Sequence, residues 1–270
     1  MPDFPRNPIE KEGYQLEFND DFDTPKLNLD NWIPYYLPHW SSRERSAPRY
    51  HLDNSNLILR IDADQAEWCP EFDENIRCSS TQTGLFAGEV GSSIGQHRFK
   101  EGLIVRESQP TQFLYTPQYG YFEARIKAVR SSNTLVALWL IGTETKAHQS
   151  GEITVFEVFG SEMTDHDAEV RYGIKPIHDP QLKPEFFHDR LAIDATDFHL
   201  YAIEWTPTQV DFYINNEKRQ TVKQSPNYPM QFMLNIYDLP IEDTLNAPYP
   251  REFVIDYVRG YQPIGGYSTL

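Results

Sequence analysis

The sequence predicts an all-β fold, an antiparallel β-sandwich or barrel. Apolar and polar residues alternate through many short segments that are rich in β-branched and aromatic residues. Gly and Pro lie between these segments as turn residues, and periodic helical stretches of ten or more residues are hard to find. Many short strands separated by turns are typical of an antiparallel sandwich or barrel.

The clearest strand covers residues 120–130. Alternation divides its side chains between two faces: Tyr121, Glu123, Arg125 and Lys127 on the first, and Phe122, Ala124, Ile126 and Ala128 on the second. Four further segments have strand composition, namely 55–62, 198–205, 209–217 and 251–261. In the third of these, "NNE" follows "DFYI" and predicts a hairpin turn.

The length and composition favour one domain over residues 1–270. A single all-β sandwich can reach about 200–250 residues. The chain contains no linker, internal repeat or low-complexity tract. No apolar segment approaches the roughly 20 residues needed to cross a bilayer.

The formal net charge is −16, from 40 acidic and 24 basic residues. This charge disfavours nucleic acid and anionic membranes as partners, because both bind to positive surface. A neutral polysaccharide is compatible with the charge, whereas a polyanionic one would need a local basic patch. Aromatic residues make up 14% of the chain, which suits sugar binding but also a β-core. We expect a monomer.

Two features bear on the cellular compartment. Cys69 and Cys78 could close a loop disulfide in an oxidising compartment or remain thiols in a reducing one. The N-terminal "MPDFPRNPIEKEGY" lacks a basic region followed by an apolar one, so we expect no signal peptide here. The compartment stays open, between a cytoplasmic protein and a secreted one whose sequence begins after its signal.

The segment 150–159, "SGEITVFEVF", has the composition of a strand but carries Glu152 and Glu157 five residues apart. In a regular strand, residues an odd number apart point to opposite faces of the sheet. One of the two carboxylates would then lie unpaired in the core, at a cost of several kcal/mol. A regular strand is therefore the wrong prediction for this segment.

A β-bulge removes the conflict. One extra residue around Val155 and Phe156 brings Glu152, Thr154 and Glu157 to one face and makes the other face apolar. Two converging carboxylates suit a retaining glycosidase, which needs a pair roughly 5–5.5 Å apart, one as nucleophile and one as acid/base. Solvated strand charges remain an alternative, because a chain this acidic contains such pairs by chance.

Seven stretches of the sequence together carry a family resemblance. They are "NDDFDTPKLNLDNW" (19–32), "YGYFEARIKA", "LVALWLIG", "GEITVFE", "FHLYAIEWTPTQVDFYIN", "MQFMLNIY" and "FVIDYVRGYQ". In this order they resemble glycoside hydrolase family 16, the laminarinase and lichenase group. The family's signature strand reads E-I/L/V-D-x-x-E, which "GEITVFE" matches with one departure. The similarity spans roughly residues 15–262.

The resemblance implies a curved β-jelly roll with a concave cleft whose walls come from the loops 63–118 and 161–197. It implies a retaining, endo-acting hydrolase of a β-linked glucan, of β-1,3 or mixed linkage, or of a related galactan. It implies no cofactor for catalysis and, by analogy, secretion. Two alternatives stay open, a transglycosylase on the same site and a non-catalytic carbohydrate-binding protein on the same fold.

Carried over by position, the resemblance makes Glu152 the nucleophile and Glu157 the acid/base. Between them the family has an Asp, and this chain has Thr154. A Thr hydroxyl can donate one hydrogen bond and orient Glu152, but it supplies no charge. We therefore expect the pKa of Glu157 to be lower than with an Asp, which lowers the pH optimum or slows the acid step.

Further positions match cleft residues of the family. Trp139 is what remains of a tryptophan-rich motif before the catalytic strand, and Asn235 and Trp205 match positions that line or support the cleft. A core role for Trp205 stays open. Lys175 takes the place of a family His after the catalytic strand, although a slipped alignment would offer His178.

Residues 40–45, "WSSRER", match W-G-N-N-E-L near the start of the family's cleft. Trp40 and Glu44 agree with that motif, and Arg43 replaces an Asn. An Arg in a sugar cleft can bind a carboxylate or sulfate as well as hydroxyls, and the alternative is a surface salt bridge. Asp256 matches a family residue that binds a structural calcium on the convex side. That ion needs six to eight oxygen ligands, which the sequence cannot count.

Overall fold

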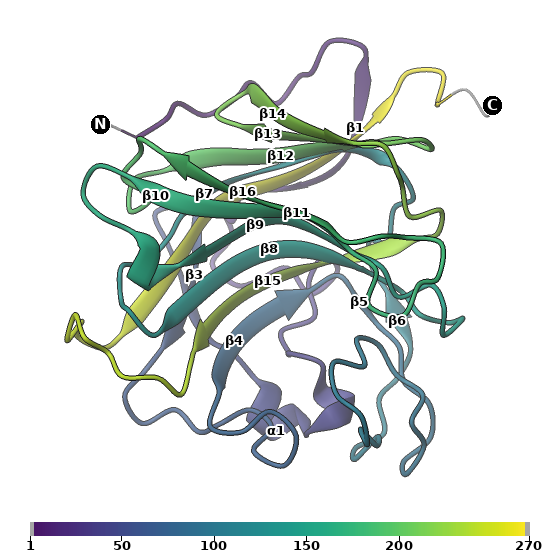
Figure 1. Cartoon of the computed structure of the whole chain (residues 1–270), viewed down its shortest axis with the longest axis vertical. Coiled ribbons are helices and arrows are strands. Elements are labelled where there is room, and N and C mark those ends of the chain that lie inside the picture. The colour runs from purple at the N-terminus through teal and green to yellow at the C-terminus, as the bar shows by residue number, and fades with distance from the viewer. Residues whose placement is uncertain (1–2, 268–270) are drawn as a thin grey trace.

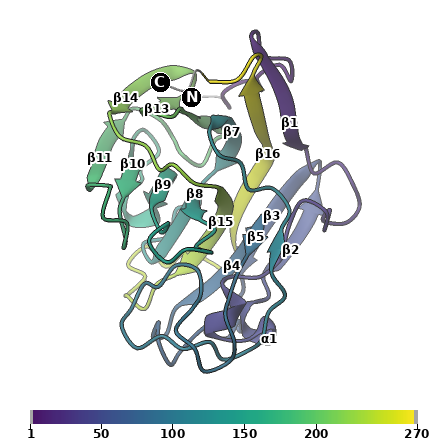
Figure 2. The same cartoon turned by 90° about the vertical axis from the view of Figure 1, so that its right-hand side faces the viewer.

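The computed structural model describes residues 3–267, which form two antiparallel sheets packed face to face (Figures 1 and 2). The first sheet is 8-stranded, in the order β14-β13-β12-β7-β16-β3-β2 with β1 paired to β16. Its strands are β1 (Tyr14–Asp20), β2 (Arg49–Asp53), β3 (Asn56–Ile61), β7 (Gly120–Lys127), β12 (His199–Trp205), β13 (Val210–Ile214), β14 (Glu217–Val222) and β16 (Arg251–Pro263).

The second sheet is 6-stranded and curved, in the order β11-β10-β9-β8-β15-β4 (Figure 1). Its strands are β4 (Arg77–Gln82), β8 (Thr134–Gly142), β9 (Glu152–Phe159), β10 (Ala168–Lys175), β11 (Glu185–Leu191) and β15 (Met230–Asp238). The remaining elements are the pair β5 (Gly84–Leu85) and β6 (Gln112–Phe113), the helix α1 (Arg43–Ser46) and the 3₁₀ turns η1 (Pro38–Trp40) and η2 (Gly160–Glu162). The predicted antiparallel sandwich is confirmed.

The main apolar core lies between the two sheets and takes one face of each strand. From β7 it takes the predicted face, with Phe122, Ala124 and Ile126 buried in it. The opposite face of β7 carries Tyr121 and Glu123, which line a pocket on the outside of the first sheet. The alternation predicted for 120–130 is thus confirmed.

The predicted hairpin after 209–214 is also confirmed. β13 ends at Ile214, and β14 pairs with it from Glu217 onward. Asn215 and Asn216 between them have φ of 52° and 65°, the left-handed conformation that a tight hairpin turn requires. Asn tolerates this conformation better than most residues, which explains the sequence signal.

A second apolar cluster lies on the other face of the second sheet, where the segments before β7 cover it. It contains Trp40, Trp68, Cys69, Cys78 and Trp139, among others. Both cysteines are buried free thiols, and burial raises the pKa of Cys69 to about 11 and that of Cys78 well above its usual value. Of the two states that the sequence left open, the structure has the reduced one.

No helix within residues 3–267 is long and apolar enough to span a bilayer.

Candidate active site

Strand β9, which carries Glu152 and Glu157, is bulged where the sequence predicts it. Against β8, Thr154 pairs with Trp139 while Phe156 pairs with the preceding residue, Leu138, so that Val155 is the extra residue. Against β10, the pairing shifts at the same place. The predicted bulge around Val155 and Phe156 is therefore confirmed on both sides of the strand.

The bulge decides which side chains of β9 meet on one face. Glu152 and Glu157 pair with Ile141 and Ala137 of β8, residues an even number apart that share the face turned away from the main core. Phe156 is fully buried in the main core. Both carboxylates consequently leave the core on the same side of the second sheet.

Glu152 and Glu157 line a cleft of about 200 Å³ on that side of the sheet. Its walls combine the second sheet with segments that lie far away in the sequence. The residues lining it are Tyr36, Ile76, His97, Leu135, Ala137, Trp139, Glu152, Glu157, Lys175, Tyr237 and Leu239. Of the predicted site residues, Trp139, Glu152, Glu157 and Lys175 line this cleft.

Glu152 is held by two donors. The hydroxyl of Thr154 donates a hydrogen bond of 2.7 Å to Oε1 of Glu152. The ammonium of Lys175 lies 3.0 Å from the same oxygen. Glu152 is only 5% exposed, so these two contacts replace the water that an ionised carboxylate would otherwise require.

Lys175 joins the two carboxylates, because its Nζ also lies 3.4 Å from Oε2 of Glu157. It stands at the end of β10, directly opposite Glu152 in the pairing with β9. Burial lowers the pKa of Lys175, but the charges of the two glutamates outweigh burial and leave that pKa raised. His178, the alternative at this position, instead places Nε2 3.0 Å from the carbonyl oxygen of Arg98.

Glu157 differs from Glu152 in its surroundings. Burial raises the pKa of Glu157 above the ordinary value, the charge of Lys175 opposes this, and the charge of Glu152 adds to it. The pKa of Glu157 stays raised in spite of the lysine. A buried carboxyl with a raised pKa beside a second, hydrogen-bonded carboxylate is the arrangement of an acid and nucleophile pair.

Trp139 forms part of the cleft floor and is anchored from behind. Its indole Nε1 donates a hydrogen bond of 2.6 Å to Oδ1 of Asn235, which is fully buried. On the cleft side, the ring of His97 meets it edge-on with the centroids 4.9 Å apart. Asn235 therefore supports the cleft through Trp139 rather than contacting a substrate.

Sequence reasoning missed the other seven residues that line the cleft, and three of these, Tyr36, His97 and Tyr237, carry polar groups. His97 comes from the loop 63–118, which the resemblance implies as a wall of the cleft. The backbone N–H of His97 donates to Oε1 of the buried Glu144 at 2.5 Å, which ties this loop to the connection between β8 and β9. No spacing in the sequence singles out His97, because its partners come from other segments.

Three residues that were predicted to bind substrate, Trp40, Arg43 and Glu44, lie outside this cleft. Trp40 is fully buried, and its Nε1 donates to the carbonyl oxygen of Gln96 at 2.8 Å. Arg43 Nε donates to Oε1 of Gln109 at 2.8 Å, and Glu44 is exposed on the same short helix. None of the three lines this cleft. Trp40 is too buried to contact a substrate, whereas Arg43 and Glu44 stay predictions as substrate contacts.

Trp205 also needs correction as a substrate residue. It lies in β12 of the first sheet, fully buried in the main core. Its Nε1 donates to Oγ of Ser225 at 2.8 Å, and its ring packs against Tyr119. The core role that the sequence left open is the one the structure supports.

Asp256 does not have the surroundings of a calcium ligand. Its Oδ2 lies 2.7 Å from Nη1 of Arg125 and 3.2 Å from Nε of Arg6. Two guanidinium groups neutralise the carboxylate and would repel a cation. Across residues 3–267, no group of three or more His, Cys, Asp or Glu side chains is arranged to hold a metal. The surroundings of Asp256 therefore do not fit the expected ion.

Comparisons with known proteins bear on the family and the fold. The model of glycosyl hydrolases family 16 matches residues 108–248, which is more than half of the chain. A GlcNAcα1-4Gal releasing endo-β-galactosidase from Clostridium perfringens is 33% identical and superposes with a TM-score of 0.85, covering 99% of this chain and 67% of that one.

Two curated relatives are more distant. A keratan-sulfate endo-1,4-β-galactosidase from Sphingobacterium multivorum is 22% identical over 242 residues, 83% of this chain and 48% of that protein. A β-glucanase from Acetivibrio thermocellus is 27% identical over 150 residues, 53% of this chain and 42% of that protein. The chain thus spans less than half the length of these relatives. On the family match and the structural similarity together, the chain belongs to glycosyl hydrolases family 16.

Proposed function

We propose that this chain is a retaining endo-β-glycosidase that cleaves β-galactoside bonds inside a glycan. The observation that carries the proposal is the bulged strand β9, which brings Glu152 and Glu157 to one face, where both contact Lys175. A regular strand of the same sequence would separate the two carboxylates onto opposite faces.

The distances to Lys175 bear on the stereochemical course. The two contacting oxygens lie 3.0 Å and 3.4 Å from one Nζ atom, so they are no farther apart than the sum of these distances. That limit allows the roughly 5–5.5 Å separation of the carboxyl pair in a retaining enzyme. The geometry is therefore compatible with direct attack by a carboxylate and retention.

In the first step, a carboxylate oxygen of Glu152 attacks the anomeric carbon and forms a glycosyl ester. The bond between the anomeric carbon and the leaving sugar breaks, and the proton of Glu157 passes to the departing oxygen. The raised pKa of Glu157 favours the protonated form that this step requires. The hydrogen bond from Thr154 and the ion pair with Lys175 hold the carboxylate of Glu152 in position for this attack.

In the second step, the ionised Glu157 removes a proton from water. The water oxygen attacks the anomeric carbon, the ester bond breaks, and Glu152 leaves as a carboxylate. Product with the original β configuration is released. A sugar hydroxyl in place of water would give transglycosylation on the same residues.

The choice of galactoside over glucoside rests on the relatives. The relative that covers nearly the whole chain is named as an endo-β-galactosidase, and so is a second relative that matches 83% of it. The β-glucanase similarity covers about half of the chain. A β-glucan is therefore the second candidate substrate, and both belong in the same assay.

The test is reducing-sugar release from keratan sulfate, a β-1,4-galactan, laminarin and mixed-linkage glucan. We expect the wild type to act on a galactose-containing polymer, and Glu152→Gln and Glu157→Gln to lose at least 10³-fold in kcat, in the range of removing a catalytic group. The control is Glu217→Gln, an exposed carboxylate on the first sheet that should leave activity unchanged.

Two readouts separate the alternatives. Proton NMR of the first product gives a β-anomer for retention, and products longer than the substrate indicate transglycosylation. Binding of one of the polymers without release of any sugar would replace the hydrolase by a non-catalytic binding protein.

A further inference from the structure

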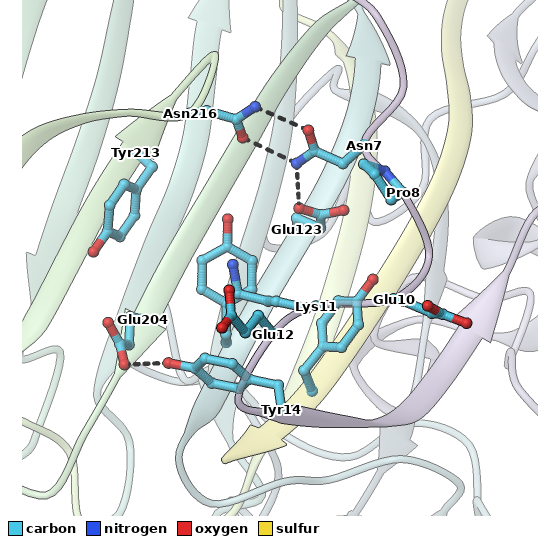
Figure 3. Close-up of a pocket in the computed structure, with 12 residues that line it drawn as sticks. Asn7, Pro8, Glu10, Lys11, Glu12, Tyr14, Glu123, Glu204, Tyr213 and Asn216 are labelled. Atoms are coloured by element: carbon cyan, nitrogen blue, oxygen red, sulfur yellow. Dashed lines mark hydrogen bonds between the residues drawn. The ribbon is translucent and has the colours of Figure 1, made fainter. Parts of the chain in front are cut away.

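A second and larger pocket lies on the outer face of the first sheet, on the other side of the molecule from the cleft. It encloses about 410 Å³. Strands β7, β12, β13 and β16 form its floor, and the N-terminal segment 7–14 forms its rim (Figure 3). The main core separates the two sites, so both can be filled at the same time.

Hydrogen bonds hold the N-terminal segment in place. Asn7 and Asn216 exchange a pair of side-chain amide hydrogen bonds, each 2.9 Å (Figure 3). Asn7 Nδ2 also donates to Oε2 of Glu123 at 2.8 Å, and Arg259 donates to the carbonyl oxygen of Asn7 at 2.9 Å. The pocket is therefore preformed, which lowers the entropy cost of binding a ligand.

Aromatic rings form the floor of this pocket. The ring of Tyr121 has three tyrosine neighbours, Tyr14, Tyr213 and Tyr261, with centroids 6.0, 6.0 and 6.2 Å away. Tyr121 and Tyr261 are buried, whereas Tyr14 and Tyr213 are partly exposed and offer an open ring surface. Partly exposed tyrosines of this kind combine an apolar face with a hydroxyl that can hydrogen-bond.

Lys11 supplies the hydrogen-bond donors. Its Nζ lies 3.6 Å above the centre of the Tyr121 ring and 5.4 Å from that of Tyr14. The ammonium group makes no hydrogen bond or ion pair with any residue between 3 and 267. The ammonium therefore has donors to spare for a ligand that carries acceptor oxygens.

The charges restrict the class of ligand. Glu10, Glu12, Glu123 and Glu204 line the pocket together with the single cation Lys11. Four carboxylates repel an anionic ligand. A cationic ligand would have to displace Lys11, which already occupies the face of Tyr121. A neutral ligand avoids both costs.

A neutral ligand must still match donors, acceptors and an aromatic face at once. Sugar hydroxyls accept from an ammonium and donate to carboxylates, and the apolar face of a pyranose ring packs on a tyrosine ring. Glu204 already accepts a hydroxyl proton, from Tyr14 at 2.5 Å (Figure 3). The volume of the pocket lies in the range of small-ligand sites.

We propose that this pocket is a second, non-catalytic binding site for a neutral oligosaccharide. Tyr213 provides the ring on which a sugar stacks, Lys11 donates to its hydroxyls, and Glu204 accepts from them. The site goes beyond the proposed hydrolysis and does not depend on it. When both sites bind the same polymer, the second site keeps the chain attached to its substrate between cleavage events.

The test uses Glu152→Gln protein, so that no substrate is consumed, and measures binding by isothermal titration calorimetry. The probes are two neutral tetrasaccharides, lacto-N-neotetraose and laminaritetraose. We expect Tyr213→Ala or Lys11→Met in this background to remove one binding site per chain or weaken it at least tenfold. Tyr50→Ala, an exposed tyrosine on β2, is the matched control and should change nothing.

Trp139→Ala in the same background identifies binding in the cleft, so failure of the proposed hydrolysis and failure of the second site give different results. Thermal melting confirms that each variant is folded. If Tyr213→Ala does not fold, Lys11→Met, which keeps the length of the side chain, provides the test. Unchanged binding in folded Tyr213→Ala and Lys11→Met proteins, with both probes, would overturn the inference.

Discussion

The hydroxyl of Thr154 donates its hydrogen bond to Glu152 from the same face of the same strand, 2.7 Å from Oε1. At this position the resemblance expects an Asp, which would add a negative charge between the two glutamates. Here the added charge near the pair is instead positive, from Lys175. The relation between these three residues leads to the first two predictions.

Removal of the Thr154 hydroxyl should slow the enzyme without unfolding it. Thr154→Val keeps the shape of the side chain but leaves Glu152 with one donor fewer. A hydrogen bond to a charged group contributes about 1.5–3 kcal/mol, so kcat/KM should fall roughly tenfold to a hundredfold. Thr154→Ser should restore most of the activity. Equal loss in the Ser and Val variants would assign Thr154 a packing role instead.

Removal of the positive charge of Lys175 should move the pH profile of kcat/KM to higher pH. Lys175→Met takes away the charge that opposes the effect of burial on Glu157, so the pKa of Glu157 rises further. The basic limb of kcat/KM, which follows loss of the acid's proton, then moves to higher pH. Thr154→Asp, which adds a negative charge, should move it the same way.

The control for this measurement is Lys218→Met, because Lys218 pairs with Asp211 on the first sheet, outside the cleft. Its pH profile should match that of the wild type. If the basic limb stays in place in Lys175→Met, then Glu157 is not the group that limits activity at high pH.

Deletion of Val155 should lower both activity and stability. It leaves Glu152 and Glu157 four residues apart, on one face of a now regular β9, but it removes the local twist with which the bulge aims Glu157. It also removes the buried side chain of Val155 from the main core. Val155→Ala keeps the residue count and should remain active with a modest loss of stability. Chemical denaturation and hydrolysis of the preferred polymer measure the two effects. A stable, active deletion variant would contradict the role given to the bulge.

Asp256 should matter as a partner of arginine and not as a metal ligand. Asp256→Asn leaves Arg125 buried without its charge partner, and breaking such a buried pair costs roughly 3–5 kcal/mol. A chelator such as EDTA should leave the melting temperature of the wild type unchanged. A drop of several degrees with EDTA, reversed by calcium, would restore the calcium prediction.

Glu144 should make the stability depend on pH. Burial raises the pKa of Glu144 from 4.5 to about 7, against the opposing hydrogen bond from the His97 backbone. The folded state favours the protonated form of Glu144. The stabilisation of the folded state by this carboxyl is therefore complete below pH 4.5 and is lost as the pH rises through 7. The loss amounts to roughly 3 kcal/mol.

Glu144→Gln is neutral at all pH values and keeps an acceptor for the His97 N–H. The free energy of unfolding, measured by urea denaturation between pH 4 and 8, should decrease with pH in the wild type and much less in this variant. Glu217→Gln, at an exposed carboxylate, should follow the wild type. Parallel curves for all three proteins would exclude a raised pKa of Glu144.

The cleft shows where sequence reasoning fails. His97 lies in a loop without periodicity and is placed by Glu144, 47 residues later. Trp40 matches a family motif and is aromatic, yet it is fully buried because the second apolar cluster closes over it. The same applies to Trp205 in the main core. The residue type and the sequence position of a tryptophan do not show whether other segments of the chain pack over it.

The sequence by itself determined the strands, the hairpin at Asn215 and Asn216, and the bulge that unites Glu152 with Glu157. These follow from local terms: the two-residue period of a strand, the backbone preferences of turn residues and the cost of burying a carboxylate. Only the tertiary structure decided that Lys175 joins both glutamates, that Arg125 and Arg6 neutralise Asp256, and that the N-terminal segment completes a pocket around Lys11. Each of these depends on contacts between segments far apart in the chain, whose distances no local pattern specifies.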